Sequence, residues 1–439
     1  MPRRKKEKSK GKVERNTIIF SISRKMEFIA DFHIHSPYSR AVSKEMTVKR
    51  IAQYAKYKGI KLVGTSDFTH PEWLATLKAE LKEKEDGIYQ PKEEAEVYFI
   101  LTTEVNNMTI KNGKLRRIHN IIFTPSFADA ERINQFLSRY GNLSSDGRPT
   151  LSLSSRDMLE GILNTSSDSF IVPSHIWTPW FSLFGSVSGY DAVEECFEDL
   201  TSEVFALETG LSSDPKMNWR LSSLDRFSLI SCSDAHSPQK LGREANVFNT
   251  KISFYEIKEV LQKKDKNRFL YTIEFFPEEG KYHYDGHRNC GINMSPKEAM
   301  LNNDLCPVCG KRLTIGVLHR VELLADRKEG FIPDNAIPYN NLIPLDEIIA
   351  DCLKVAKESI AVKNKYLEMV KGIGPEFDIL LKVPVEEIKK KTGLERIGEG
   401  IERMREGKVK LSPGYDGVFG KISLFEEEKP KEEPQMTLF

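Results

Sequence analysis

The sequence predicts an α/β fold in which strands form a barrel and helices surround it. Three observations predict this fold. Seven short apolar runs typical of buried strands recur up to residue 232, helical patterns such as residues 48–59 separate several of them, and six of the chain's 9 histidines stand at or near their ends. Alternating strands and helices favour parallel pairing, and the carboxyl ends of parallel barrel strands meet at one mouth. Residues far apart in the sequence are therefore expected to converge there.

The seven expected strands are residues 27–30, 60–63, 97–103, the run around His119, 170–172, 204–207 and 229–232. Each carries polar side chains at or just beyond its end. In chain order these are His33 and His35, Asp67 and His70, Glu104, His119, His175, Glu208, and Asp234 with His236. All but Glu208, which is expected to contact substrate, are candidate metal ligands.

This histidine pattern favours a metal centre at the barrel mouth. A lone histidine on an apolar strand is more often a core residue than a ligand. Six at strand ends, three of them within four residues of Asp31 or Asp234, are better explained by ligation. Imidazoles bind zinc, manganese or iron and carboxylates bridge such ions, so the set suits two or three divalent metals, Zn²⁺, Mn²⁺ or Mg²⁺.

Length and composition limit the other possibilities. At 439 residues the chain is expected to form two or three domains. The net charge of +1 does not indicate a partner, and no apolar run has the length of a signal peptide or a membrane span. We therefore expect a cytoplasmic protein with no membrane partner. Six cysteines, three of them grouped, favour metal binding in a reducing compartment over disulfides.

A second metal site is predicted between residues 283 and 309. His287 and Cys290 form one pair separated by two residues, and Cys306 and Cys309 form another fifteen residues later. This spacing is typical of a structural zinc finger, in which two knuckles bring four ligands together. His283 is an alternative to His287. His319 has no partner motif and is expected to be structural.

An aromatic segment directly follows His175. Trp177, Trp180 and Phe181 surround a Thr-Pro break, so a loop is expected rather than a helix. These rings either stack on a nucleic-acid base at the mouth or cap the barrel. Further polar residues expected at the same mouth are candidates for substrate contacts, namely Glu208, Asn218, Arg220 and Arg243.

The expected domains are a basic disordered arm (1–25), the barrel (26–265), a zinc-finger module (270–325), a helical DNA-binding domain (326–425) and an acidic tail (426–439). Helical spacing covers residues 342–369 and 385–404. The tail ends in Gln435, Leu438 and Phe439, which resemble the short peptide that binds sliding clamps.

Residues 26–260 resemble the polymerase-and-histidinol-phosphatase (PHP) superfamily. Five motifs occur in its order: residues 31–36, the block at Asp67, Glu104 to His119, His175, and residues 233–236. The resemblance implies a distorted seven-stranded β/α barrel and metal-dependent phosphoester hydrolysis, with His33, His35, Glu104, His119, His175, Asp234 and His236 as ligands. Asp234 or Asp67 could also accept the proton of the attacking water.

Two positions depart from the superfamily pattern. Ala41 stands where a further ligand is common, and Phe68 replaces the histidine that usually follows the aspartate. One metal position is therefore left to Asp67, to His70 or to both.

The barrel, finger and helical segment together resemble the endonuclease Q family of DNA repair nucleases, over nearly all of residues 26–425. That resemblance implies cleavage of the phosphodiester 5′ of uracil, hypoxanthine, xanthine or an abasic site, with damaged DNA as partner and a location at the nucleoid. A phosphatase for small phosphomonoesters and a non-catalytic DNA-binding adaptor are the alternatives. No phosphate-binding loop indicates a nucleotide cofactor.

Overall fold

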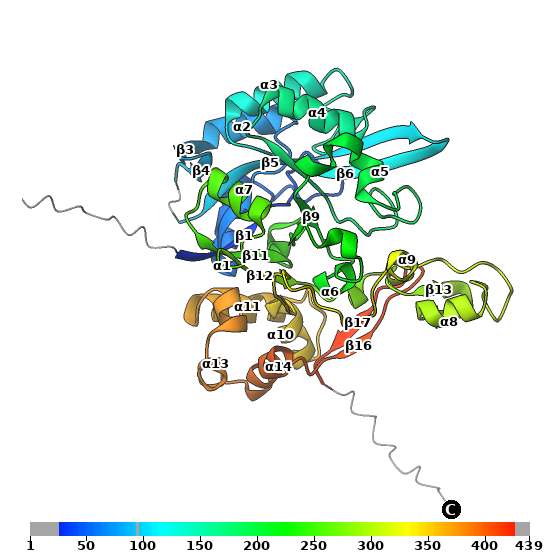
Figure 1. Ribbon diagram of the computed structural model, residues 1–439. Helices are drawn as coiled ribbons and strands as arrows, with labels where there is room; N and C mark the ends of the chain where they lie inside the picture. The colour runs from blue at the N-terminus through cyan, green and yellow to red at the C-terminus, as the bar shows by residue number, and fades with distance from the viewer. Residues whose placement is uncertain (1–25, 94–95, 426–439) are drawn as a thin grey trace, which may run out of the picture.

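The computed structural model describes residues 26–93 and 96–425, which form a barrel, a projecting finger module and a helical carboxyl-terminal part (Figure 1). The basic arm and the clamp-like residues Gln435, Leu438 and Phe439 lie outside the described residues. Within the described part, no helix is both long and apolar enough to cross a membrane.

Strands occupy all seven expected positions. They are β1 (Met26–Asp31), β2 (Ile60–Gly64), β5 (Tyr98–Lys111), β6 (Lys114–Thr124), β8 (Phe170–Pro173), β9 (Ala206–Glu208) and β10 (Ser228–Ile230). The first five belong to one sheet of 11 strands, whereas β9 and β10 form a separate parallel pair. The prediction of the strands is confirmed, although the sheet has more strands than expected.

The expectation of parallel pairing is wrong for part of the barrel. β1, β2 and β5 pair in parallel, but β5 with β6 and β6 with β8 are antiparallel. The reason is a two-residue turn, Asn112-Gly113, whose residues have φ angles of 54° and 72°. Positive φ at both positions matches a hairpin turn with the twist of the flanking strands. The chain therefore returns directly after β5, with no crossover helix.

Six further strands extend the main sheet: β3 (Leu81–Glu85), β4 (Ile88–Pro91), β7 (Thr150–Leu151), β11 (Ala245–Thr250), β12 (Phe269–Glu274) and β15 (Tyr339–Asn341). β11 runs antiparallel to β1, and β12 and β15 continue the sheet from there. The barrel sheet thus includes segments that we expected in the finger and helical domains.

Helices cover the outside of the sheet. They are α1 (Val48–Lys58), α2 (Pro71–Glu80), α3 (Phe127–Leu137), α4 (Ser155–Thr165), α5 (Val193–Phe197), α6 (Pro215–Asn218) and α7 (Phe254–Lys263), with short 3-10 turns η1 (Glu198–Glu203), η2 (Ser222–Leu224), η3 (Pro238–Lys240) and η4 (Pro277–Glu279). α1 begins after Thr47, whose side chain accepts the Arg50 amide, and ends at Gly59 with φ of 88°.

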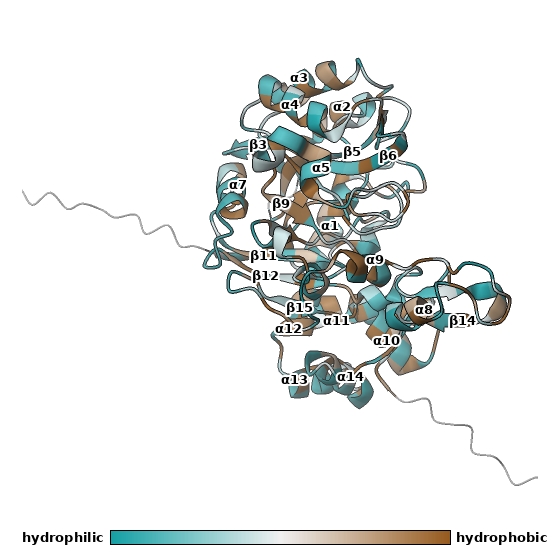
Figure 2. Ribbon diagram, turned by 45° about the vertical axis from the view of Figure 1, so that its right-hand side comes forward, coloured by the Kyte–Doolittle hydropathy of each residue, from teal (hydrophilic) through white to brown (hydrophobic). Residues whose placement is uncertain are grey.

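Aromatic side chains fill part of the interior. Phe123 stacks on Phe170 with ring centroids 4.5 Å apart, and Phe32 packs against Phe123 and Phe248 at 5.6 and 6.0 Å. Figure 2 shows brown, apolar colouring on the inner strands near β9, whereas the outer helices α3 and α4 mix brown and teal. This packing fixes the strands whose ends carry the site residues.

The finger module contains β13 (Asp285–His287), η5 (Arg288–Cys290), β14 (Ile292–Met294), α8 (Pro296–Leu301) and α9 (Val317–Leu324). Its own core is small, with Ala299, Cys306 and Leu313 as the buried apolar residues. So small a core stabilises a module poorly without a metal or other cross-link.

The carboxyl-terminal part contains α10 (Leu345–Leu353), α11 (Ile360–Gly372), α12 (Glu376–Leu381), α13 (Val385–Thr392) and α14 (Glu395–Arg405), then a hairpin of β16 (Lys410–Ser412) and β17 (Lys421–Ser423). The expected helices are confirmed. A buried ion pair, Lys58 Nζ to Glu376 Oε2 at 2.6 Å, joins them to α1, and Tyr366 donates to the same carboxylate at 2.8 Å.

Candidate metal centre

The ends of two strands bring one set of ligands together. His33 and His35 follow β1, Asp234 follows β10, and the ligand atoms of these three side chains lie within 4.8 Å of one another. His35 Nε2 lies 2.9 Å from Asp234 Oδ1. His33 Nε2 is buried, has no hydrogen-bond partner, and lies 3.5 Å from Glu104 Oε2 and 3.8 Å from Asp234 Oδ1. A buried nitrogen aimed at two carboxylates without a hydrogen bond fits a metal ligand.

A second set consists of Glu104 on β5, His119 on β6 and His175 after β8, again within 4.8 Å. Glu104 Oε1 lies 2.9 Å from His119 Nδ1 and 3.2 Å from His175 Nε2. Its other oxygen lies 3.5 Å from His33 Nε2 and 3.6 Å from His35 Nε2. Glu104 therefore stands between the two sets, where a bridging carboxylate belongs in a multimetal centre.

Burial and the charges within the two sets shift the pKa values of their members in opposite directions. Burial lowers the pKa of His119 to about 4, although the Glu104 carboxylate opposes this shift. Burial raises the pKa of Glu104, but the positive charges of His119, His33 and Arg148 outweigh it and hold the pKa well below its usual value. Burial lowers the pKa of His33, His35 and His175, but nearby carboxylates raise it overall, for His35 to about 9, so these three rings would lose a proton when a divalent cation binds.

Two further carboxylates orient the histidines. Glu208 accepts from His33 Nδ1 at 3.0 Å, and Asp67 Oδ1 lies 3.3 Å from His35 Nδ1. Asp67 Oδ2 also accepts from Ser36 and Ser39 at 2.6 and 2.7 Å. Burial raises the pKa of Asp67, but His35 and these donors lower it to about 2. Such carboxylate–histidine pairs fix the ring that binds the metal.

The metal-ligand position that the sequence leaves to Asp67 or His70 is not filled clearly by either residue. Neither residue belongs to the two barrel sets found among the described residues. Asp67 has both oxygens engaged, and His70 precedes α2 with its ring stacked on Tyr38 at 4.4 Å. His236 also lies outside the sets, with its ring 4.7 Å from that of His35. His70 Nδ1 is nevertheless buried without a hydrogen-bond partner, as His33 Nε2 is, so ligation by Asp67, His70 and His236 stays a prediction.

The backbone around the centre is strained. His175, Asp234, Asp67 and Phe181 have φ angles of 31°, 47°, 43° and 62°, in the region that side chains other than glycine rarely adopt. Such conformations persist where the surrounding structure enforces them, and they collect at functional sites. Gly210, with φ of 64°, lies so near that a Cβ there would approach His175 Cβ to 2.4 Å.

The mouth residues divide into buried and accessible groups. Trp177 is 1% exposed and donates its indole N–H to Asn218 Oδ1 at 2.8 Å, and Glu208 is fully buried. Asn218 is buried as well. The expectation that Trp177, Glu208 and Asn218 contact substrate is corrected, because their buried side chains support the walls of the centre from inside. Trp180 is 41% exposed, and the Phe181 ring lies 5.0 Å from His119.

The two arginines expected at the mouth also have partners. Arg220 pairs with Glu322 on α9, and Arg243 donates to the Ser233 carbonyl at 3.0 Å. Arg220 thus braces the joint between the barrel and the finger module, which corrects its assignment to substrate binding. Arg243 stays a candidate, since it lies beside the turn that carries Asp234.

Arg148 was missed from the sequence. Its Nη1 lies 3.2 Å from Glu104 Oε2, and 23% of its side chain is exposed. It sits in the loop before β7, and no motif or periodicity points to it. It places a fixed, partly accessible positive charge at the metal centre.

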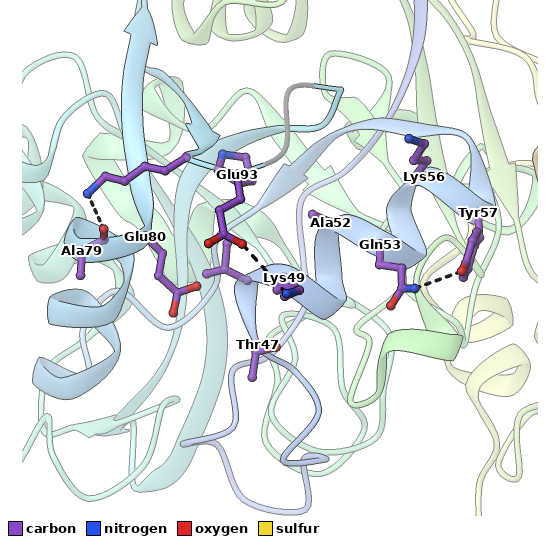
Figure 3. A pocket seen from close by; sticks show the side chains of 12 residues that line it. Thr47, Lys49, Ala52, Gln53, Lys56, Tyr57, Ala79, Glu80 and Glu93 are labelled. Carbon is purple, nitrogen blue, oxygen red and sulfur yellow. Dashed lines mark hydrogen bonds and ion pairs between the residues drawn. The ribbon is translucent and has the colours of Figure 1, made fainter.

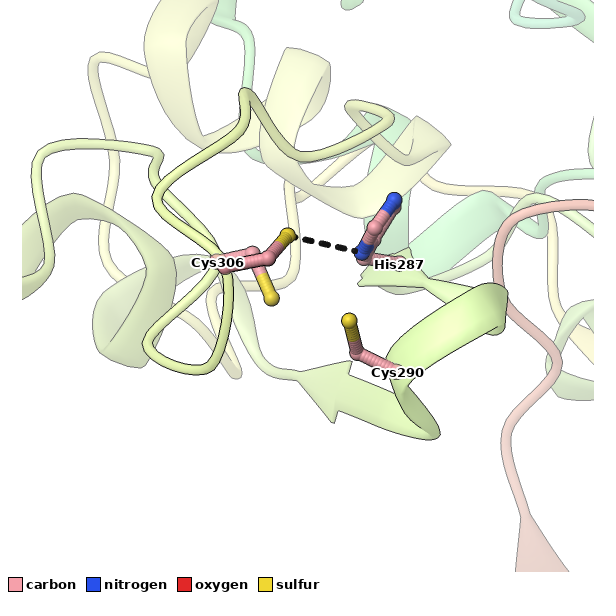
Figure 4. Close-up of side chains that lie close together, drawn as sticks. His287, Cys290 and Cys306 are labelled. Atoms are coloured by element: carbon pink, nitrogen blue, oxygen red, sulfur yellow. Dashed lines mark hydrogen bonds between the residues drawn. The ribbon is translucent and has the colours of Figure 1, made fainter.

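The finger ligands also converge. His287, Cys290, Cys306 and Cys309 have ligand atoms within 4.8 Å of one another, and Cys309 Sγ lies 3.5 Å from His287 Nδ1. Figure 4 shows the labelled side chains facing a common point. Burial raises the pKa of Cys306, but backbone amides of Cys309 and Val308 lower it overall, which favours the thiolate.

The two histidines beside the finger take no part in this group. His283 is 4% exposed and stacks on Tyr284 with ring centroids 5.5 Å apart. His319 lies with Nδ1 2.6 Å from Asp285, in keeping with the structural role expected for it.

Replacing Cys306 with Ser is expected to lower the zinc content by about one ion per chain and leave the barrel metals in place. The finger core is too small to keep its fold alone, so its loops should become sensitive to proteolysis. Elemental analysis and limited proteolysis measure both effects. Cys352→Ser, at a buried cysteine on α10, is the control, and unchanged zinc in Cys306→Ser would contradict the ligand assignment.

A hollow of about 890 Å³ lies elsewhere, between α1, α2 and the end of β4 (Figure 3). Its side chains pair among themselves, as in Gln53 Nε2 to Tyr57 Oη at 3.0 Å and Lys49 Nζ to Glu93 at 4.0 Å. None of the proposed metal ligands lines it. It is separate from the metal centre.

Known proteins resemble this chain, some over its carboxyl-terminal helices or about half of its length and others over most of it. A family model described as the MJ0043 C-terminal domain matches residues 344–408, which contain α10 to α14. The uncharacterized protein MJ0043 of Methanocaldococcus jannaschii is 32% identical over 255 residues. This match covers 56% of the present chain but only 31% of the length of MJ0043. The uncharacterized protein YqxK of Bacillus subtilis is 28% identical over 413 residues, 90% of this chain and 98% of that one.

A solved structure decides the family. The crystal structure of PfuEndoQ, a lesion-specific endonuclease from Pyrococcus furiosus, has a TM-score of 0.81 and 33% identity, and covers 92% of this chain and 96% of that chain. The chain belongs to the endonuclease Q family. Endonuclease Q has also been solved with a 27-mer duplex that has an abasic lesion at the active site, with a TM-score of 0.80, 33% identity and coverage of 91% and 97%. Membership in the endonuclease Q family makes the chain a DNA repair endonuclease. The two ligand sets at the barrel mouth fit a metal-dependent phosphodiesterase.

Proposed function

We propose that this endonuclease Q family member hydrolyses the phosphodiester 5′ of deaminated bases (uracil, hypoxanthine and xanthine) and of abasic sites. The observation that carries the proposal is the pair of ligand sets sharing Glu104 at the barrel mouth. A relative that aligns with 91% of this chain has been solved with an abasic duplex, which supports damaged DNA as partner. Such a role would place the protein at the nucleoid.

The proposed chemistry uses the donors described above. Two or three divalent ions (Zn²⁺, Mn²⁺ or Mg²⁺) held by them would lower the pKa of a bound water and stabilise negative charge on the phosphate and leaving oxygen. Asp234 is the candidate to accept the proton of the attacking water, because its side chain is 28% exposed whereas Asp67 is buried. Arg148 is placed to neutralise charge on the phosphate.

Cleavage beside a damaged base requires that the nucleotide leave the stack, at a cost of a few kcal/mol that a lesion reduces. Trp180 and Phe181 are the aromatic residues of the mouth with exposed or partly exposed rings. We propose that they face the displaced nucleotide. Arg243, beside the Asp234 turn, is the remaining polar candidate at this mouth.

One nicking assay tests this function. Purified full-length protein with Mg²⁺ or Mn²⁺ is mixed with labelled duplexes that contain uracil, hypoxanthine, xanthine or an abasic site, and with an undamaged duplex. We expect a nick 5′ of each lesion and none in the undamaged control. Turnover of a phosphomonoester without nicking would favour the phosphatase alternative. Binding of all the duplexes without nicking would favour the adaptor.

A further inference from the structure

An exposed phenylalanine lies at the end of the β16–β17 hairpin loop. Within that loop, Tyr415 and Val418 exchange backbone hydrogen bonds of 3.0 and 2.7 Å around Asp416-Gly417, whose φ angles are 42° and 84°. Two positive φ angles make this a tight primed turn. The side chain of Phe419, which follows, is 72% exposed. A single exposed ring indicates nothing by itself, so its neighbours decide whether it belongs to a binding surface.

Two other aromatic rings and a cation lie along the same surface. Lys281 Nζ lies 5.3 Å from the centroid of the Phe419 ring and 6.0 Å from that of Tyr282. The Tyr282 ring in turn packs edge-on against Trp180 at 5.3 Å. We name Trp180, Lys281, Tyr282 and Phe419 the aromatic platform. It joins the barrel mouth to the carboxyl-terminal hairpin.

The finger module holds the platform in place. Asp416 accepts from the Arg288 amide at 2.7 Å and from Thr314 Oγ1 at 2.6 Å, and Gly417 N donates to Lys281 O at 2.8 Å. Arg288 directly follows the proposed zinc ligand His287. In Figure 1, β16 and β17 run from the helical part toward α9 and the finger. The turn that carries Phe419 therefore contacts the residue directly after a proposed zinc ligand.

The platform is continuous with the metal centre. Thr178 Oγ1 lies 3.2 Å from the proposed ligand His175 and donates to the Trp180 carbonyl at 2.9 Å. Phe181, next in the chain, lies 5.0 Å from His119. A nucleic-acid strand whose phosphate reaches the metals would pass this surface.

We propose that the aromatic platform binds unpaired DNA bases next to the cleavage position, by stacking on Phe419 and Trp180, with Lys281 pairing a backbone phosphate. Exposed rings interleaved with a cation are the features that bind single-stranded nucleic acid without reading its sequence. The inference rests on the proposed function and adds to it a role for the finger and the hairpin. DNA bases, rather than a protein partner, are favoured because the platform adjoins the metal centre.

The platform is tested with a single-stranded oligonucleotide that carries 2-aminopurine, whose fluorescence falls when it stacks. We expect Phe419→Ala in the full-length protein to bind it roughly 5- to 150-fold more weakly than wild type, and to lose the quenching. Phe419→Tyr should keep both. Phe331→Ala is the matched control, because Phe331 is also exposed and lies 4.2 Å from Arg327 but is outside the platform.

Lys281→Met provides an independent measurement. Loss of one phosphate contact should reduce the slope of log Kd against log salt by about one. Wild-type affinity, quenching and salt slope in both Phe419→Ala and Lys281→Met would overturn the platform, while nicking by wild type would still support the proposed function. Absence of nicking by wild type would contradict the proposed function alone, since these binding measurements need no cleavage.

Discussion

Replacing Asp234 with Asn is expected to reduce nicking of uracil-containing DNA by roughly 10³-fold or more, the scale of losing a full electrostatic contribution of about 4 kcal/mol. Asp234 Oδ1 lies 2.9 Å from His35 Nε2 and 3.8 Å from His33 Nε2. Burial raises the pKa of Asp234, but the hydrogen bond from His35 and the charges of His33 and His35 keep it far below its usual value. Asn has nearly the same shape but neither the negative charge nor a basic oxygen. Single-turnover nicking measures the effect.

Two controls separate the possible causes of that loss. Elemental analysis of Asp234→Asn distinguishes a missing barrel metal from a centre that holds its metals but cannot accept the proton. Asp334→Asn, at an exposed aspartate in the loop before β15, should nick at the wild-type rate. Equal nicking by Asp234→Asn and wild type would remove Asp234 from the metal centre.

The strands and the ligand positions could be predicted because both depend on local patterns. Apolar runs marked β1, β2 and β5, and the residues just after β1 and β10 converge as expected for strand ends. The strand end expected at Glu104 is wrong, because β5 continues to Lys111 and Glu104 lies within it. The antiparallel return at β6 was missed although Asn112-Gly113 is a strong hairpin signal. The alternation of strands and helices elsewhere outweighed that signal.

Roles that depend on long-range contacts could not be predicted. Trp177 and Trp180 are the same residue type three positions apart, yet one donates to Asn218 in the core and the other is exposed. Arg148 gains its role only from Glu104, which lies 44 positions earlier in the chain. Phe419 stands in a turn-rich segment, and the binding role proposed for it depends on its contact with Lys281, which is distant in the sequence. No local pattern encodes such pairings.

Replacing Arg148 with Met is expected to lower kcat by about 10²- to 10³-fold while the barrel metals stay bound. The guanidinium lies 3.2 Å from Glu104 Oε2 in this structure. Burial lowers the pKa of Arg148, but the carboxylates of Glu104, Asp234 and Asp67 raise it overall, so the charge is permanent. Because Glu104 would share its charge with metal ions, the guanidinium is then free to contact a phosphate that enters the centre.

Arg148→Lys separates this role from simple charge balance. Lysine restores the positive charge but lacks the planar fork that binds two phosphate oxygens at once, so we expect only partial recovery of kcat. If Arg148 served only to neutralise Glu104, lysine would restore full activity, and Arg148→Met would instead change the metal content measured by elemental analysis. An unchanged kcat in Arg148→Met would exclude contact with the reacting phosphate. A loss in kcat with retained metals would show that Arg148, beside Glu104, acts on the substrate itself.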